Sequence, residues 1–411
     1  MNVLHLSTAD IEQGAARAAY RLHSGLKQIG LSSEMLVRSK RTLDPTVHVS
    51  SHLSTKLSPA IDGLPARLYR DRDRDVFSAQ WFPSNVVQMA RSLQPDIVNL
   101  HWIANGFLQI ESLRQLNRPL VWTLHDMWPF TGGCHYTREC QGYLKQCGSC
   151  DHLNSQRDWD LSRWIWQRKA KAWKDLNITV VSPCQWLAEC ISKSRLMAHC
   201  PVHIIPNGLD VQTYRPTAVK LARKLLDLPQ HKKIVLFGAS PGLTEGTRKG
   251  IQYLLPALQQ LNQCKEEVEL VVFGAIAPKS PPQLGYPIRY LGKFHDDLSL
   301  SLIYSAADVM VVPSVQEAFG QTATEALACA TPVVAFRATG PKDIVKHQQT
   351  GYLADPFEAA DLARGIDWIL ADPERHQRLR LAARQSATHE FSLEVQARRY
   401  LSLYETLLAA S

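Results

Sequence analysis

Residues 311–334, VVPSVQEAFGQTATEALACATPVV, carry the strongest indication of the fold of this chain. An apolar run at 309–312 ends at Pro313, a polar loop follows, and alanines then recur before the run TPVVAF at 331–336. This order predicts a buried strand, a turn, a helix that lies close to a sheet, and another strand. In a parallel sheet of this kind, ligands bind at the carboxyl ends of the strands.

Two glutamates, Glu317 and Glu325, frame this turn. Glu317 is expected in the loop after the strand and Glu325 at the start of the helix, so both should project into one crevice. The backbone N–H groups of Gly320, Gln321 and Thr322 would then lie at a helix N-terminus, where the helix dipole favours phosphate. The spacing alone also fits a solvated loop carboxylate and a first-turn glutamate that stabilises its own helix.

The rest of the chain repeats this alternation of strands and helices, which implies right-handed crossovers and parallel sheets. Because 411 residues exceed the usual size of a single core, we expect an α/β fold with two doubly wound domains. We expect domains at 1–205 and 206–385, divided at the turn Pro206-Asn207-Gly208, and a closing helical segment at 386–411. The expected strands lie at 2–7, 33–39, 96–102, 119–126 and 178–183, and at 202–208, 233–240, 268–275, 288–294, 308–314, 331–336 and 351–356.

Composition and charge limit the classes of function. With 45% hydrophobic and 20% charged residues, the chain is globular, and it contains neither a long apolar run nor a signal sequence, so we expect a cytoplasmic protein. Residues 1–205 carry 24 Lys and Arg against 17 Asp and Glu, whereas residues 206–411 carry 22 against 21. A basic first half suits anionic lipid headgroups or a phosphorylated acceptor. Nucleic acid is not expected, because the arginines at 67–75 alternate with acids and no reading motif is present.

A resemblance to a known family sharpens these expectations. The segment 305–356 resembles the donor-binding half of retaining glycosyltransferases of family four, which have the GT-B fold, and the two glutamates match the E-x7-E motif of that family. The resemblance is strongest over 206–365 and good over 1–30 and 95–190. It implies two Rossmann-like domains that face each other across a cleft, with the last helix crossing back onto the first domain.

The resemblance also implies an activity of the type found in bacterial polysaccharide biosynthesis. Such an enzyme transfers a sugar from a nucleoside diphosphate sugar to a glycan or lipid-linked acceptor without a catalytic metal or other cofactor. Glu317 would bind the sugar hydroxyls and Glu325 the ribose hydroxyls, with Phe319 and residues 320–322 completing the donor side. A nucleotide-sugar epimerase and a non-catalytic nucleotide-sugar-binding protein remain alternatives.

The N-terminal loop is a second candidate for donor binding. The strand Val3–Leu6 runs into small residues that would let the backbone approach a ligand closely, although a plain tight turn explains them equally well. The phrase QGAARAAYRLHSGLKQIG at 13–30 resembles the loop with which the family covers the donor diphosphate. The resemblance assigns Gly14 and Arg17 to donor binding.

His125 is a third candidate, because it ends the strand PLVWTLHD at 119–126. A polar residue after such an apolar run faces the crevice, although a hydrogen-bonded core histidine is the usual alternative. In the resembling family, a histidine at this strand end lies beside the reacting sugar carbon. His101 and Trp102 end the neighbouring strand and are expected on the acceptor side. Asp126 is expected either to orient His125 or the acceptor, or to cap the following turn.

Cations are needed to bind a diphosphate, and the loop ASPGLTEGTRKG at 239–250 offers two. Lys249 precedes a helix N-terminus, where a bound anion would compensate an unfavourable ammonium, although a solvated loop lysine is equally compatible. Lys249 matches the diphosphate lysine of the family. The arginine that the family commonly places after the strand glycine is replaced by Ala239, so the second cation is either missing or supplied by Arg248.

Four of the nine cysteines crowd into TGGCHYTRECQGYLKQCGSC at 131–150. Such a group indicates a structural zinc or free thiols, with disulfides less expected in a cytoplasmic chain. A catalytic zinc is not expected, because four thiolates would leave no open coordination position. The residues concerned are Cys134, Cys140, Cys147 and Cys150, with His135 and His152 as alternative ligands.

The expected helix at 161–175, LSRWIWQRKAKAWKD, mixes tryptophans with cations. This composition suits peripheral contact with an anionic membrane or binding of a polyanionic acceptor. An ordinary domain helix that packs through its tryptophans, with its cations in water, is the preferred interpretation.

Overall fold

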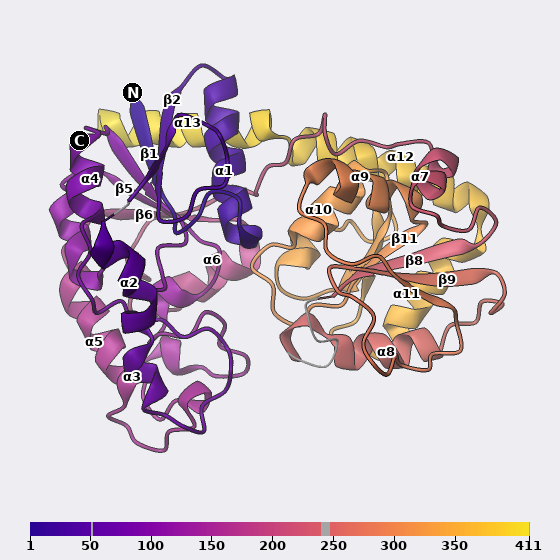
Figure 1. The fold of residues 1–411 in the computed structure, drawn as a ribbon, viewed down its shortest axis with the longest axis horizontal. Helices are drawn as coiled ribbons and strands as arrows, with labels where there is room; N and C mark the ends of the chain where they lie inside the picture. Colours follow the sequence, from indigo (N-terminus) through magenta and orange to yellow (C-terminus); the bar gives the residue numbers. More distant parts are fainter. Residues whose placement is uncertain (51, 240–246, 411) are drawn as a thin grey trace. The chain divides into compact units, whose positions relative to one another are not determined.

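The structure is a computed structural model that describes residues 1–50, 52–239 and 247–410. It divides into two compact units, drawn in Figure 1. Unit 1 comprises Met1–Gly208 with Leu393–Ser411, and unit 2 comprises Leu209–Ser392. These divisions lie a few residues beyond the expected boundaries at 205 and 385.

The sheet of unit 1 has seven strands in the order β3-β2-β1-β4-β5-β6-β7, and every neighbouring pair is parallel. The chain winds from β1 outward to β3 and then returns beside β1 to start β4, so the strand order reverses between β1 and β4. The short edge strand β3 has no counterpart among the predicted strands. The strands are β1 (Asn2–Leu6), β2 (Ser32–Val37), β3 (Val47–Val49), β4 (Ile97–Leu100), β5 (Leu120–Thr123), β6 (Ile178–Ser182) and β7 (Val202–Ile204).

Helices α1 and α13 lie side by side in unit 1 (Figure 1), although they come from opposite ends of the chain. Leu22 and Leu26 of α1 share a core with Tyr400 and Tyr404 of α13. The Tyr404 hydroxyl accepts a hydrogen bond from Asn99 at 2.7 Å, so the last helix is tied to the sheet. The helices are α1 (Gln13–Gln28), α2 (Leu53–Asp62), α3 (Leu64–Arg67), α4 (Val86–Ser92), α5 (Leu161–Trp173), α6 (Gln185–Ser192) and α13 (Leu393–Ala409), with 3-10 segments η1 (Ile110–Leu116), η2 (Trp128–Phe130), η3 (Gly142–Leu144) and η4 (Asp151–Leu153).

The sheet of unit 2 has six parallel strands in the order β10-β9-β8-β11-β12-β13. They are β8 (Lys233–Gly238), β9 (Val268–Phe273), β10 (Ile288–Tyr290), β11 (Val309–Val312), β12 (Val333–Phe336) and β13 (Gly351–Ala354). The helices are α7 (Val219–Leu225), α8 (Ile251–Gln259), α9 (Asp297–Ala306), α10 (Gln321–Ala328), α11 (Ala359–Ala371) and α12 (Pro373–Glu390), with 3-10 segments η5 (Thr247–Lys249) and η6 (Gly340–Asp343).

Both faces of this second sheet are covered, because successive residues of a central strand belong to different cores. In β11, Met310 and Val312 join one buried cluster, whereas Val309 and Val311 join the other. Alternate residues of a strand point to opposite faces, so the sheet is buried on both sides. The two parallel sheets confirm the predicted α/β fold with doubly wound domains.

The strand order of unit 2 reverses between β8 and β11, which places the ends of these two strands at a switch point. The loop after β11 is described throughout, whereas residues 240–246 of the predicted cation loop after β8 lie outside the described residues. Within the described ranges, no helix is both long and apolar enough to span a membrane.

Candidate functional site

Glu317 lies in the loop after β11 and contacts two cations. The Lys249 ammonium forms an ion pair with Glu317 Oε2, and Nη1 of Arg248 lies 3.6 Å from the same oxygen. Burial alone would raise the pKa of Glu317, but the charges of Lys249 and Arg248 outweigh it and lower this pKa. Glu317 is therefore an ionised carboxylate with two cationic partners at the switch point.

Backbone contacts hold the two loops in this arrangement. The Arg248 carbonyl accepts a hydrogen bond from Val315 N–H at 2.8 Å, and the Arg248 guanidinium donates to the Gln316 carbonyl at 3.0 Å. Gly250 has a φ of +74°, and a Cβ there would lie 1.7 Å from the Pro313 carbonyl oxygen. A glycine is therefore required immediately after Lys249 for the loops to meet.

The N-terminus of α10 follows Glu317 directly. Gly320 is the N-cap residue with a φ of +110°, and no side chain caps the helix there within the described structure. Gln321 and Thr322 form the first turn, so their N–H groups lie at the positive end of the helix dipole. The Phe319 side chain is buried in the core beside Phe391, so Phe319 offers its backbone and not its ring to this surface.

Glu325 lies in the second turn of α10, which corrects the expectation that it begins the helix. The helix starts four residues earlier because Gly320 adopts the positive φ that ends the preceding loop. The Glu325 side chain is buried, and its Oε2 accepts a hydrogen bond from the Tyr304 hydroxyl at 2.9 Å. Burial raises the pKa of Tyr304 well above its usual value, so the phenol stays protonated and donates. Tyr304 thus fixes the orientation of a carboxylate that a helix places beside the switch point.

In unit 1, His125 belongs to a chain of three histidines at neighbouring strands. Nδ1 of His5 lies 2.9 Å from Nε2 of His101, and Nδ1 of His101 lies 3.0 Å from Nε2 of His125. The contact follows from the sheet order, since β1, β4 and β5 are adjacent and these residues lie in or just after them. The rings of His101 and His125 are also stacked, with centroids 5.3 Å apart.

These three rings are neutral at neutral pH. Burial lowers the pKa of His125 to about 4, and it lowers the pKa values of His5 and His101 well below the usual value. A neutral imidazole has a single N–H, so both hydrogen bonds must run in the same direction along the chain. Nε2 of His5 is buried without a partner among the described residues. A buried bare nitrogen is more readily tolerated than a buried N–H, so we assign His5 and His101 as donors and the proton of His125 to Nδ1.

Asp126 caps a turn and holds two aromatic side chains, and no hydrogen bond to His125 is found in the described chain. Its Oδ1 accepts from the Trp128 backbone N–H at 2.9 Å, and its Oδ2 accepts from the Trp102 indole at 2.7 Å. His135 Nδ1 lies 2.6 Å from the same Oδ2. Burial would raise the pKa of Asp126, but His135 and the N–H donors lower it below its usual value. Asp126 was expected either to orient His125 or the acceptor, or to cap the following turn, and the geometry supports the turn cap.

Comparison with known proteins identifies the family. Residues 13–213 match the protein family described as Glycosyltransferase Family 4, and residues 244–386 match the family described as Glycosyl transferases group 1. A phosphatidyl-myo-inositol mannosyltransferase of Mycobacterium leprae is 30% identical over 315 residues, which cover 74% of this chain and 75% of that protein. This chain belongs to glycosyltransferase family 4.

Other relatives of this family 4 chain match over less of their length. A D-inositol 3-phosphate glycosyltransferase of Xylanimonas cellulosilytica is 34% identical over 49% of this chain and 51% of the relative. The match to the Segniliparus rotundus protein of the same name covers 47% of that relative, so the chain spans about half the length of these two.

Solved structures show the fold of this chain. Sucrose-phosphate synthase of Thermosynechococcus elongatus has a TM-score of 0.70 at 21% identity, over 100% of both chains. Anabaena HepE in complex with UDP and glucose has a TM-score of 0.67 at 17% identity, over 99% of this chain and 100% of HepE. The chain has the GT-B fold, as the resemblance implied.

The predicted N-terminal loop of this chain is shorter than expected, because α1 already begins at Gln13. Gly14 is therefore an exposed residue of the first helical turn, and Arg17 is a half-buried residue of the second. Gln13 itself has a φ of +67°, so the strained position precedes the glycine. The structure leaves both residues near the end of β1, on a helix and not in a loop.

Helix α5 packs as a domain helix. Trp173 is buried and its indole donates to the Ile110 carbonyl at 2.9 Å, while Arg168 pairs with Glu111 at 2.6 Å. Lys169 is completely buried, which the expectation of solvated cations missed. The preferred interpretation therefore describes the packing of Trp173, whereas its solvated cations are wrong for Lys169 and for Arg168, whose side chain is only 13% exposed.

Two partners of the candidate site were missed by sequence reasoning. His5 and Tyr304 contact His101 and Glu325 through side chains that lie 96 and 21 residues away along the chain. The available signal was a polar residue inside an apolar strand or helix, as in NVLHL, where His5 interrupts β1. A fully buried polar side chain of this kind requires a partner.

Proposed function

We propose that this chain transfers a sugar from a nucleoside diphosphate sugar to a glycan or lipid-linked acceptor, with retention of the anomeric configuration. One observation carries the proposal: Glu317, Lys249 and Arg248 meet at the switch point of unit 2, beside the N-terminus of α10. A carboxylate that can accept from sugar hydroxyls next to cations that can bind a diphosphate is the chemistry that a nucleotide sugar requires. HepE, which shares the fold, contains UDP and glucose.

In the proposed donor complex, the two cations move from Glu317 to the diphosphate. The Lys249 side chain is 48% exposed, so it can turn toward a phosphate without unpacking the core. The first-turn N–H groups of Gln321 and Thr322 would add dipole stabilisation to the same anion. Glu317, freed from its cations, would accept hydrogen bonds from the sugar hydroxyls.

Glu325 is proposed to bind the ribose hydroxyls. Its carboxylate is preoriented by Tyr304, so little side-chain entropy is lost when the nucleoside binds. Preorientation of this kind increases affinity without adding a contact. By the family resemblance, Gly14 and Arg17 would complete the donor side.

The proposed chemical step needs no enzymic nucleophile. In the retaining mechanism suggested by the resemblance, the departing phosphate oxygen takes the acceptor proton on the same face of the sugar. Lys249 would stabilise the charge that grows on the diphosphate, and His125 would donate a hydrogen bond beside the reacting carbon. The assigned Nδ1–H of His125 is the donor available for this role. His101, Trp102 and Asp126 are proposed to line the acceptor side.

The test uses a panel of UDP-, GDP- and ADP-sugars with and without lipid-linked acceptors. We expect acceptor-dependent release of the nucleoside diphosphate and a product whose anomeric proton, measured by NMR, has the configuration of the donor. Interconversion of sugars without release would show an epimerase, and binding without turnover would show a binding protein; either result excludes the proposal. An inverted product would exclude retention alone. Lys249→Ala is the matched inactive variant, and Lys232→Ala, another lysine of unit 2, is the charge control.

Peripheral contact with an anionic membrane is a separate part of the proposal. It rests on the excess of basic residues in 1–205. Vesicles with and without phosphatidylglycerol would be sedimented with the protein at low and high salt. We expect binding only to the anionic vesicles and release by salt; equal recovery with neutral vesicles would exclude an electrostatic contact.

A further inference from the structure

A small cavity in unit 1 brings all four clustered cysteines to one place. Cys134, Cys140, Cys147 and Cys150 line a cavity of about 20 Å³. A volume of this order holds about one water-sized group. Every cysteine in the chain is a free thiol, so no disulfide accounts for the cluster.

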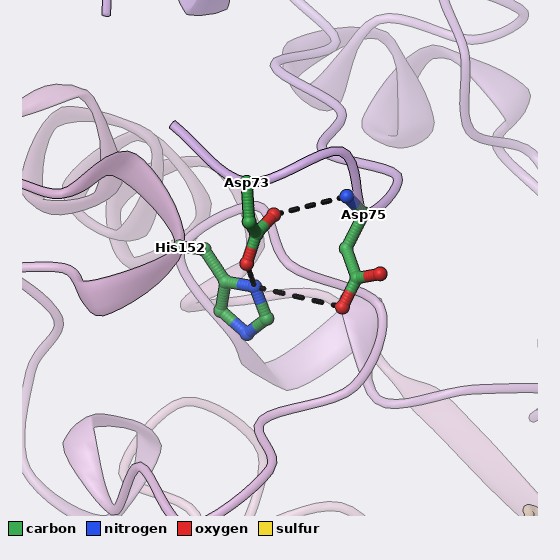
Figure 2. A group of neighbouring side chains, drawn as sticks. All are labelled: Asp73, Asp75 and His152. Carbon is green, nitrogen blue, oxygen red and sulfur yellow. Dashed lines mark hydrogen bonds and ion pairs between the residues drawn. The ribbon is translucent and has the colours of Figure 1, made fainter. Parts of the chain in front are cut away.

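His152 lines the same cavity and has one ring nitrogen to spare. Its Nδ1 lies 2.7 Å from Oδ2 of Asp73, whereas its Nε2 is buried with no partner in the described structure. Figure 2 shows Nδ1 facing the carboxylates of Asp73 and Asp75, and Nε2 pointing away from them. A histidine whose N–H is held by a carboxylate and whose other nitrogen is bare has the arrangement found in metal-ligating histidines.

The carboxylates of Asp73 and Asp75 are a less suitable metal site than the cysteine cavity. Among the described residues, Asp73, Asp75 and His152 are the group of three whose ligand atoms all lie within 4.8 Å of one another, whereas no three of the cysteine sulfurs and His152 meet that distance and they would have to draw together around an ion. Arg138 already lies within this group, with its guanidinium 3.1 Å from Asp73 and 2.6 Å from Asp75. A metal ion at the carboxylates would be repelled by this guanidinium, so their role is to orient His152.

Backbone N–H groups point at three of the four sulfurs, although burial raises the pKa of Cys134, Cys147 and Cys150 and keeps them as thiols while no cation is bound. Gly142 N–H donates to Sγ of Cys140 at 3.4 Å, Gly132 N–H donates to Cys147, and the N–H groups of His152 and Leu153 donate to Cys150. Backbone donors directed at sulfur stabilise negative charge there. Three of the four sulfurs therefore have donors suited to a metal thiolate.

Lys169 is a buried amine whose positive charge an anionic group in the cavity would stabilise. Its ammonium is completely buried, 3.0 Å from the Thr131 carbonyl and 3.5 Å from the centre of the Trp128 ring. Within the described ranges it forms no ion pair with a carboxylate, and burial lowers the pKa of Lys169 well below its usual value; Cys147 and Cys134 are the groups that most oppose this shift. An isolated buried ammonium is costly, and an anionic metal–thiolate group nearby would offset it.

We propose that this cavity is a structural zinc site in which Cys134, Cys147 and Cys150 are thiolate ligands and either His152 or Cys140 is the fourth. The three cysteines are the buried members of the cluster, and tetrahedral coordination by sulfur and nitrogen is what zinc prefers. Such a centre carries one or two net negative charges, which Lys169 reduces. The zinc would fix the loop 131–153, which otherwise contains only short 3-10 segments.

The first test uses the intact wild-type chain and needs no substrate. Protein purified without chelator should contain about one zinc per chain, and X-ray absorption should show zinc–sulfur distances of about 2.3 Å. Chelation should lower the Tm by about 5 °C or more, and zinc should restore it. If the purified protein contains no zinc and its Tm changes neither with chelator nor with added zinc, the proposal is overturned.

Variants then locate the metal. Cys147→Ser and Cys150→Ser should lose the zinc, whereas Cys200→Ser should keep it, because Cys200 is as buried as Cys150 but lies outside the cavity. Loss of zinc from His152→Ala or from Cys140→Ser identifies the fourth ligand, and either result supports the site. Zinc that persists in Cys147→Ser and Cys150→Ser but disappears in Asp75→Asn lies at the carboxylates, which would overturn the proposal.

Discussion

Unit 1 should lose stability as the pH falls from neutral toward 4, because it holds four neutral histidines: His5, His23 and His101 are buried, and His125 is half-buried. Burial lowers the pKa of His23 and of His125 to about 4, and it lowers those of His5 and His101 well below 6.5. A histidine with a depressed folded pKa contributes stability that is fully present above its unfolded pKa. That contribution is lost as the pH falls through the folded pKa, because the unfolded chain binds the proton first.

The size of the loss follows from these values. For His23 and His125 the folded pKa lies about 2.5 units below 6.5, and each unit corresponds to about 1.4 kcal/mol, so each contributes about 3.4 kcal/mol. Asp62 acts in the opposite direction: burial raises its pKa from 3.8 to about 6, and its protonation returns about 3 kcal/mol as the pH falls. The net loss is about 3–4 kcal/mol by pH 4.5, and His5 and His101 add to it.

Urea unfolding at pH 7.5, 6.5, 5.5 and 4.5 measures this loss. Nine of the ten tryptophans belong to unit 1, so tryptophan fluorescence reports mainly on the unit that contains the histidines. His125→Gln keeps a polar amide beside His101 and should reduce the number of protons taken up on unfolding by about one, which lowers the slope of the free energy of unfolding against pH. His203 is an exposed histidine of unit 1, so His203→Gln should leave that slope unchanged. A free energy of unfolding that changes by less than about 1 kcal/mol across the range would refute the reasoning.

Three further outcomes are expected. Lys249→Ala should reduce kcat about 10²–10³-fold, with the fold intact by circular dichroism, because the diphosphate charge loses its ammonium; near-normal turnover would remove Lys249 from the chemistry. Glu325→Gln should raise the KM for the donor about tenfold or more, and Tyr304→Phe should raise it less, because it loosens the carboxylate without removing it; an unchanged KM in Glu325→Gln would exclude ribose binding. Gly250→Ala should lower the Tm, since its Cβ would meet the Pro313 carbonyl at a φ of +74°; an unchanged Tm would show that the two loops are not locked together.

The fold was predictable because strand and helix periods in this chain are unambiguous. Runs such as 309–312 and 333–336 are apolar at every position, as expected for strands buried on both faces, and they form β11 and β12. The edge strand β3 was missed because Val47–Val49 is only three residues long and pairs with one neighbour. Short edge strands have too little apolar pattern to be recognised.

The candidate site was predictable where chain position alone sets the geometry. Lys249 and Glu317 follow strands that turned out to be adjacent, so their side chains meet although 68 residues separate them. The start of α10 was placed too late because the alanines mark the buried face of a helix and say nothing about its first residue. Partners such as Tyr304 and His5 depend on which helix or strand becomes a neighbour, and that is decided by sheet order, which periodicity does not contain.

The placement of α13 has a consequence for synthesis on the ribosome. Tyr400 and Tyr404, which fill the core of unit 1 beside Leu22 and Leu26, are translated only after the whole of unit 2. At about 5–20 residues per second, the first half of the protein waits roughly 10–40 s with this apolar surface uncovered. Unit 2 is contiguous in sequence and can finish folding first, although it emerges second. The nascent first half is therefore a natural client for chaperones, and a circular permutant that begins at Leu393 would close the same core without the delay.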